Sequence, residues 1–83
     1  MSLPRKGQIL MNTRTGRYEV VISANLVFQS QKFYDLTTRK VRKDGVSWGN
    51  KEHHAVTLSQ PLPWRYVVVP VGSEPSALSK WRG

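Results

Sequence analysis

The sequence predicts an all-β fold: a small antiparallel barrel or strongly curved sheet of five to six strands, with a short C-terminal helical turn. Turn-forming residues recur along the chain, and the segments between them, about 5–10 residues long, suit strands better than helices. Those segments are rich in β-branched and aromatic side chains, which strands favour. In a chain of 83 residues, closure would remove exposed strand edges, which favours an SH3-like or OB-like barrel.

Five strands are expected, at residues 8–12, 17–25, 33–42, 53–60 and 66–71. In the second strand, alternation places two sets of side chains on opposite faces. The first set is Tyr18, Val20, Ile22 and Ala24, and the second is Glu19, Val21, Ser23 and Asn25. In the fourth strand, Val56 and Leu58 share a face with His54.

Two connections are typical of hairpins. Residues 12–16 join the first two strands with Gly16 in the left-handed region, and residues 43–45 form a tight turn in which Gly45 supplies a positive φ. Residues 46–48 are then expected to pair back on the third strand as a short sixth strand, followed by another turn at residues 49–50. One helical turn is the alternative for residues 26–34, which have no clean period.

The C-terminal part of the chain changes in character. Residues 66–71 show no alternation, which predicts a strand buried on both faces, although Pro70 cannot donate a ladder hydrogen bond and favours a strand end or an edge. In the tail, residues 73–83, one helical turn capped by Ser76 would lay Leu78 and Trp81 on the core. Otherwise the tail is a disordered terminus. One β domain over residues 1–72 with a tail over 73–83 is expected.

Composition excludes several classes of protein. The chain has no cysteine, and therefore no disulfide framework and no thiolate metal site. No apolar run approaches the roughly 20 residues of a membrane span, and the N-terminus lacks the apolar stretch of a signal peptide. A cytoplasmic protein is expected. The opening, a basic stretch ended by Gly7 and followed by a strand, is similar in layout to Tudor, KOW and other SH3-like modules, without a family motif.

The net charge of +8 is concentrated in two blocks. Residues 1–17 have a net +4, and so do residues 32–51, which hold six basic residues and two acids. Four cations of the second block lie together just before Asp44-Gly45: Arg39, Lys40, Arg42 and Lys43. Because a strand divides these side chains between its two faces, we expect them on a hairpin tip that projects into solvent.

Basic hairpins of this kind contact duplex grooves or phosphate backbones, and exposed aromatic side chains stack on bases. The sequence therefore predicts a nucleic-acid-binding protein, with DNA or RNA, and single or double strand, left open. The expected phosphate-binding residues are Arg39, Lys40, Arg42, Lys43, Arg14, Arg17, Arg5 and Lys6, and the expected stacking residues are Tyr34 and Trp48. Cross-strand packing is an equal alternative for Trp48. Phe33 and Tyr18 are expected in the core.

A second hypothesis is a non-enzymatic interaction module or regulator whose positive face docks on an acidic protein partner. The strand that contains residues 67–69 would then be an edge for pairing with another chain or within a homo-oligomer.

Catalytic and metal chemistry are not predicted. His53 and His54 are adjacent on a strand and point to opposite faces, so without a bulge they cannot hold one metal together. The alternative is a site through one of them, with Glu52 and Asp44 as the nearby carboxylates. The five acids are scattered singly, and no nucleophile motif or phosphate-binding glycine loop occurs. We expect no enzyme activity, no cofactor, no metal and no membrane partner.

Overall fold

A computed structural model describes residues 3–26, 32–59, 62 and 65–82 of the chain. These residues form five strands and one 3₁₀ helix: β1 (Ile9–Asn12), β2 (Tyr18–Leu26), β3 (Phe33–Val41), β4 (Ser47–Thr57), β5 (Tyr66–Val68) and η1 (Ser76–Arg82). The all-β prediction is confirmed, as is a short helical segment near the C-terminus. The helical turn considered for residues 26–34 falls mostly outside the described residues, and both of its ends belong to strands.

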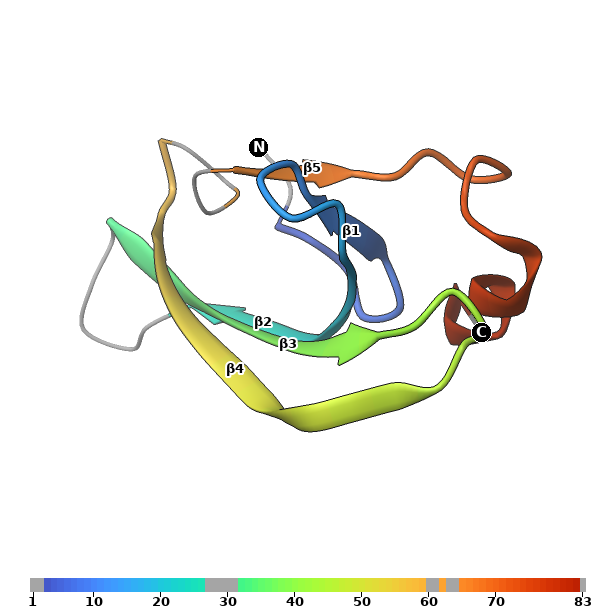
Figure 1. Ribbon diagram of the computed structural model, residues 1–83. Helices are drawn as coiled ribbons and strands as arrows, with labels where there is room; N and C mark the ends of the chain where they lie inside the picture. Colours follow the sequence, from blue (N-terminus) through green and yellow to red (C-terminus); the bar gives the residue numbers. More distant parts are fainter. Residues whose placement is uncertain (1–2, 27–31, 60–61, 63–64, 83) are drawn as a thin grey trace.

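The strands form one antiparallel sheet in the order β4-β3-β2-β1-β5. Figure 1 shows that the sheet is strongly curved. Within the described residues, its two edge strands, β4 and β5, do not pair with each other, so the sheet stays open. A curved antiparallel sheet is therefore confirmed, whereas closure into a barrel is wrong.

One long strand, β4, contains most of two segments that the sequence predicts as separate strands, residues 46–48 and 53–60. Its pairing with β3 shifts between Thr38 and Lys40, so that Gly49, Asn50 and Lys51 together lie opposite Arg39. Gly49 has a φ of 72°, a backbone conformation that glycine adopts without steric cost. The turn predicted at residues 49–50 is wrong: this segment is a β-bulge, which bends the strand without reversing it.

A second bulge, between Val21 and Ser23, interrupts β2. Before the bulge the predicted alternation is confirmed, because Val20 and Val21 belong to hydrophobic clusters on opposite faces of the sheet. After it the alternation is inverted, since one extra residue shifts the pleat by one position. Ala24 therefore packs with the cluster of Val21, and its predicted place on the face of Val20 is wrong.

The sheet carries a hydrophobic cluster on each face. The first consists of Ile9, Val20, Val41, Val69 and Leu78, with Tyr18 and Trp81 among the side chains packed against it. The second consists of Leu10, Val21, Tyr34, Leu36 and Val56, with Leu58 and Tyr66 among those packed against it. Tyr18, Val56 and Leu58 lie in or against these clusters, as alternation predicts, whereas Phe33 is 41% exposed at the start of β3, so its predicted core position is wrong.

The helix η1 covers the first cluster. Its Leu78 is completely buried, which contributes roughly 1.5–3 kcal/mol relative to an exposed leucine. The backbone approaches closely at two glycines, because a Cβ at Gly7 or Gly45 would collide with the carbonyl oxygen of Trp81 or Ala77, respectively. No helix in the described part of the chain is long and apolar enough to span a membrane.

The last strand, β5, is a short edge. Among the described strands it pairs only with β1, and its Val67 and Val68 are each 42% exposed. Burial of residues 66–71 on both faces is therefore a wrong prediction. Pro70 lies beyond the end of the strand, as its missing N–H donor requires.

Candidate functional site

The pairing of β2 with β3 brings the two basic blocks together. Tyr18, the first residue of β2, lies opposite Val41, the last residue of β3. Arg17 immediately precedes one of these residues, and Arg42 and Lys43 immediately follow the other. Cations that are about 25 positions apart in the chain therefore meet at the same end of the sheet.

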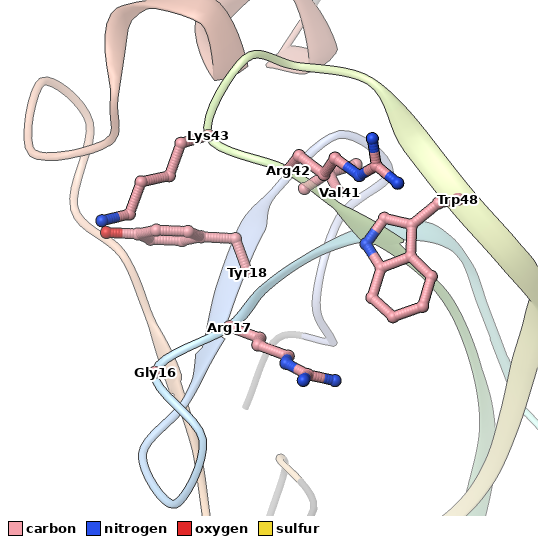
Figure 2. A pocket seen from close by; sticks show the side chains of 7 residues that line it. All are labelled: Gly16, Arg17, Tyr18, Val41, Arg42, Lys43 and Trp48. Carbon is pink, nitrogen blue, oxygen red and sulfur yellow. The ribbon is translucent and has the colours of Figure 1, made fainter.

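A pocket of about 350 Å³ lies at this end of the sheet. We call it the basic pocket, and its lining residues are Gly16, Arg17, Tyr18, Val41, Arg42, Lys43 and Trp48. Figure 2 shows the Trp48 ring on one side and the Tyr18 ring on the other, with the Arg17 side chain below and Lys43 beside Tyr18. One wall thus comes from the start of β2, and the other from the hairpin that joins β3 to β4.

Trp48 both packs across the sheet and faces cations. It lies opposite Lys40, and the Lys40 Nζ is 4.8 Å from the centre of the indole ring. The guanidinium carbon of Arg17 is 5.8 Å from the same centre, within the range of cation–π contacts. Lys40 is also 3.3 Å from the Glu52 carboxylate, and this ion pair holds its side chain beside the ring. The two roles considered for Trp48 are therefore compatible, because the half-buried ring still lines the pocket.

The three cations that line the pocket have no acidic partner in the described part of the chain. The side chains of Arg17, Arg42 and Lys43 are exposed, and within the described residues no carboxylate oxygen lies within 4.0 Å of their charged nitrogens. The described ion pairs instead join Lys40 to Glu52 and Arg82 to Glu74. The pocket therefore concentrates uncompensated positive charge next to an aromatic ring.

Hydrogen bonds donated by backbone amides hold the two turns that frame the pocket. In the turn before β2, the Asn12 side-chain oxygen accepts hydrogen bonds from the amides of Arg14 (2.9 Å) and Thr15 (3.4 Å). In the turn after β3, the Gly45 amide donates to the Arg42 carbonyl at 2.8 Å. This tight turn is confirmed at the predicted place.

The basic hairpin does not project freely into solvent. The Trp81 indole N–H donates to the Gly45 carbonyl at 3.0 Å, and the turn backbone packs against Ala77 of η1. Figure 1 shows the C-terminal helix directly beside the turn between β3 and β4. The expectation of a projecting tip is therefore wrong, because the helix covers one side of it.

The remaining predicted cations are not among the residues that line the basic pocket. Arg14 is exposed in the turn between β1 and β2, whereas Arg5 and Lys6 are exposed near the other end of β1. Arg39 is half-buried and lies opposite Val20, and its Nε has no hydrogen-bond partner in the described structure.

Tyr34 cannot stack on a base in this structure. Its side chain is completely buried in the second hydrophobic cluster, and burial raises the pKa of its phenol. The predicted stacking role of Tyr34 is therefore wrong. Trp48 remains the predicted stacking residue that lines the pocket.

A second polar site, which the sequence did not predict, lies beside the basic pocket. Glu19, Lys40 and Trp48 lie opposite one another across β2, β3 and β4, so they share a face of the sheet. A pocket of about 240 Å³ opens on this face. We call it the polar pocket, and its lining residues are Asn12, Thr15, Arg17, Glu19, Lys40, Glu52 and Tyr66. Arg17 belongs to both pockets.

Glu19 is buried and hydrogen-bonded through both carboxylate oxygens. The Thr38 hydroxyl donates to Oε1 at 2.6 Å, and the Tyr66 hydroxyl donates to Oε2. Because Thr38 uses its proton on Glu19, the Nε2 of His54, 3.2 Å from that hydroxyl, must donate to it. Burial raises the pKa of the Tyr66 phenol, and the hydrogen bond to Glu19 raises it further, so the phenol remains a donor.

A metal-ligating geometry is present in part. Ligand atoms of Glu19, Glu52 and His54 lie within 4.8 Å of one another, although His53 and His54 face opposite ways as predicted. All three side chains already have protein partners, since Glu19 and His54 bond to Thr38 and Glu52 pairs with Lys40. The buried carboxylate is therefore satisfied by the protein itself.

Comparisons with known proteins return no match: no family model, no curated protein and no solved structure is significantly similar to the chain.

Proposed function

We propose that the protein binds nucleic acid, with phosphate groups held by Arg17, Arg42 and Lys43 and a base held against Trp48. The observation that carries this proposal is the basic pocket itself, which gathers three cations that have no acidic partner among the described residues beside a half-buried indole ring. Guanidinium and ammonium groups donate charge-assisted hydrogen bonds to phosphate oxygens, and tryptophan offers a stacking surface to any base. The proposed role is binding without catalysis, in the cytoplasm.

The other exposed cations contribute at longer range. Arg5, Lys6 and Arg14 lie outside the pocket but add to the positive field around it. Their long-range attraction is screened by salt over about 10 Å, whereas each direct phosphate contact releases counterions and so contributes to the slope of affinity against salt.

The test compares two triple variants that remove the same charge. One is Arg17→Ala, Arg42→Ala, Lys43→Ala in the pocket, and the control is Arg5→Ala, Lys6→Ala, Lys51→Ala. All six side chains are exposed, so neither variant removes packing from the core. Fluorescence anisotropy with labelled oligonucleotides measures Kd across a range of salt concentrations.

We expect the pocket variant to lose most of its affinity and the control to lose little. The slope of log K against log salt should flatten by about 2 to 3 in the pocket variant, because each phosphate contact contributes roughly 0.7–0.9. Equal losses in the two variants would show that only the net charge matters. A protein that purifies with a low 260/280 nm absorbance ratio and binds no oligonucleotide would favour the acidic protein partner instead.

A further inference from the structure

We propose that the ligand is a single strand, with one unpaired base inserted beside Trp48 and its phosphates on the outer, cationic side of the basic pocket. This inference rests on the proposed function and specifies its substrate. Three features of the described residues support it: the form of the hairpin, the size of the pocket and the arrangement of charges around it.

The form of the hairpin disfavours insertion into a duplex groove. A β-ribbon that reads the major groove must enter a channel about 12 Å wide. Here the turn after β3 is covered on one side by η1, through the Gly45 carbonyl bonded to Trp81 and the close approach of Ala77. The cations Arg42 and Lys43 thus sit on a supported surface, which suits contact with a flexible backbone better than penetration of a groove.

The size of the basic pocket suits one nucleotide. Its volume, about 350 Å³, is at the lower end of the range for small-ligand sites. The Trp48 ring lies inside the pocket, and Arg17 lies within cation–π distance of its centre. A duplex keeps its bases paired and stacked, so a base could reach this ring only after it had been flipped out of the helix. A single strand offers its bases without that step.

The charges around the pocket give the ligand a direction. Arg17, Arg42 and Lys43 line the basic pocket, whereas the polar pocket next to it is lined by two cations, Arg17 and Lys40, and two carboxylates, Glu19 and Glu52. A phosphate backbone is attracted to the basic pocket, while the opposite charges of the polar pocket balance one another. The strand should therefore lie with its phosphates toward the cations of the basic pocket and its base toward Trp48.

The test uses four labelled probes of ten nucleotides on the unmodified protein. They are single-stranded DNA, RNA of the same sequence, the DNA annealed to its complement, and a DNA strand whose internal positions are abasic. The abasic strand keeps the phosphates and removes the bases. At physiological salt we expect either single strand to bind at least about tenfold more tightly than the duplex. We expect the abasic strand to bind about 5- to 150-fold more weakly than its parent.

A variant pair assigns the base contact to Trp48. Trp48→Ala should weaken binding to the normal strand by the same factor as removing the bases, and should not change binding to the abasic strand. Trp48→Phe should retain most of the affinity. Circular dichroism establishes that each variant is folded. The comparison of the abasic strand with its parent uses the unmodified protein, so it does not depend on the folding of any variant.

The two proposals fail in different ways. If the duplex binds as tightly as the single strand, or the abasic strand as tightly as its parent, the single-strand inference is overturned while nucleic-acid binding stands. If no probe binds, the proposed function itself is wrong. If the pocket and control triple variants bind alike, net charge alone accounts for the binding, and the basic pocket is not the binding site.

Discussion

At the scale of single residues, the most informative side chain is Glu19. It lies in a strand between apolar residues and is only 3% exposed, yet both of its oxygens accept hydrogen bonds from hydroxyl groups. A buried carboxylate without such donors would be costly, because transfer from water removes its solvation. Thr38, itself 1% exposed, is therefore as important to this arrangement as the acid.

The first prediction concerns this hydroxyl. Thr38→Val keeps the shape and the β-branching but leaves Oε1 of Glu19 and the His54 ring without their shared partner. We expect a loss of about 1–3 kcal/mol in the free energy of unfolding, measured by urea denaturation. Thr37→Val is the matched control, since within the described structure its hydroxyl bonds to the exposed His53 alone and its loss should be smaller. Equal losses would contradict a special role for the Glu19 hydrogen bonds.

Sequence reasoning misplaced the aromatic pair at the start of β3, although the signal was present. Tyr34 shares its face with Leu36, and Phe33 shares its face with Asp35. Alternation applied to this strand would have placed Tyr34 inside and Phe33 outside, as the structure has them. Classifying aromatic residues by type alone gave the opposite assignment. For Trp48 the alternation also holds, because the β4 bulge adds two residues and leaves Trp48 on the face of Glu52 and His54.

At the scale of elements, turns and bulges are difficult to distinguish in a sequence. Gly45 and Gly49 both have a positive φ, and each has a polar neighbour: Asp44 precedes Gly45, and Asn50 follows Gly49. The first reverses the chain and the second only bends it, and the difference depends on whether the flanking residues continue to pair with β3. Four of the five strands were predicted to within a few residues. The start of β4 was not, because the local sequence does not show that residues on both sides of Gly49 pair with β3.

The second prediction concerns the contact between the basic hairpin and η1. Gly45→Ala is expected to destabilise more than Gly16→Ala. Both positions have a positive φ, 88° and 71°, which costs an alanine roughly 1–2 kcal/mol. Only at Gly45 would the new Cβ also lie 2.5 Å from the Ala77 carbonyl oxygen, while nothing lies within 4 Å at Gly16.

The measurement is urea unfolding of both variants, followed by oligonucleotide binding. The additional loss in Gly45→Ala, and weaker binding through the displaced Arg42 and Lys43, would demonstrate that η1 supports the pocket. If Gly16→Ala were equally destabilised, backbone conformation alone would explain both effects, and the contact with η1 would have no measurable role.

At the scale of the whole molecule, one face of the sheet is covered by the C-terminal helix and not by closure of the strands into a barrel. The sheet stays open, and η1 covers one of its faces with Leu78 and Trp81. The prediction that a helical turn in the tail would lay Leu78 and Trp81 on the core is confirmed, although the sequence did not show which cluster they would cover. The meeting of Arg17 with Arg42 and Lys43 likewise depends on long-range pairing, which composition does not contain.

The third prediction concerns the pH dependence of stability and rests on the ion pair between Glu74 and Arg82. The carboxylate accepts hydrogen bonds from Arg82 Nε at 2.9 Å and from the Gly72 amide at 2.9 Å. The pKa of Glu74 is lowered, first by its own backbone amide and also by Arg82. Because the folded protein binds this proton less tightly than the unfolded chain, the stabilisation is complete above the ordinary carboxyl pKa and is lost as the pH falls through the folded-state value.

We therefore expect Glu74→Gln to lower the Tm at neutral pH, and the difference from the unmodified protein to shrink as the solution is acidified. Thermal unfolding at several pH values measures this. Asp35→Asn, which removes an exposed carboxylate, is the control for net charge. A difference between Glu74→Gln and the unmodified protein that stayed constant with pH would contradict the assignment.

The opposition of Tyr18 to Val41 also links binding to folding. In the unfolded chain Arg17 and Arg42 are far apart, and only the pairing of β2 with β3 makes them neighbours. A ligand that contacts both cations therefore stabilises the pairing of the two strands. At 100 times its Kd, such a ligand would add about 2.7 kcal/mol to the free energy of unfolding, reduced by any affinity that the ligand has for the unfolded chain. For so small a domain, occupancy of the pocket would be a substantial part of what keeps the chain folded.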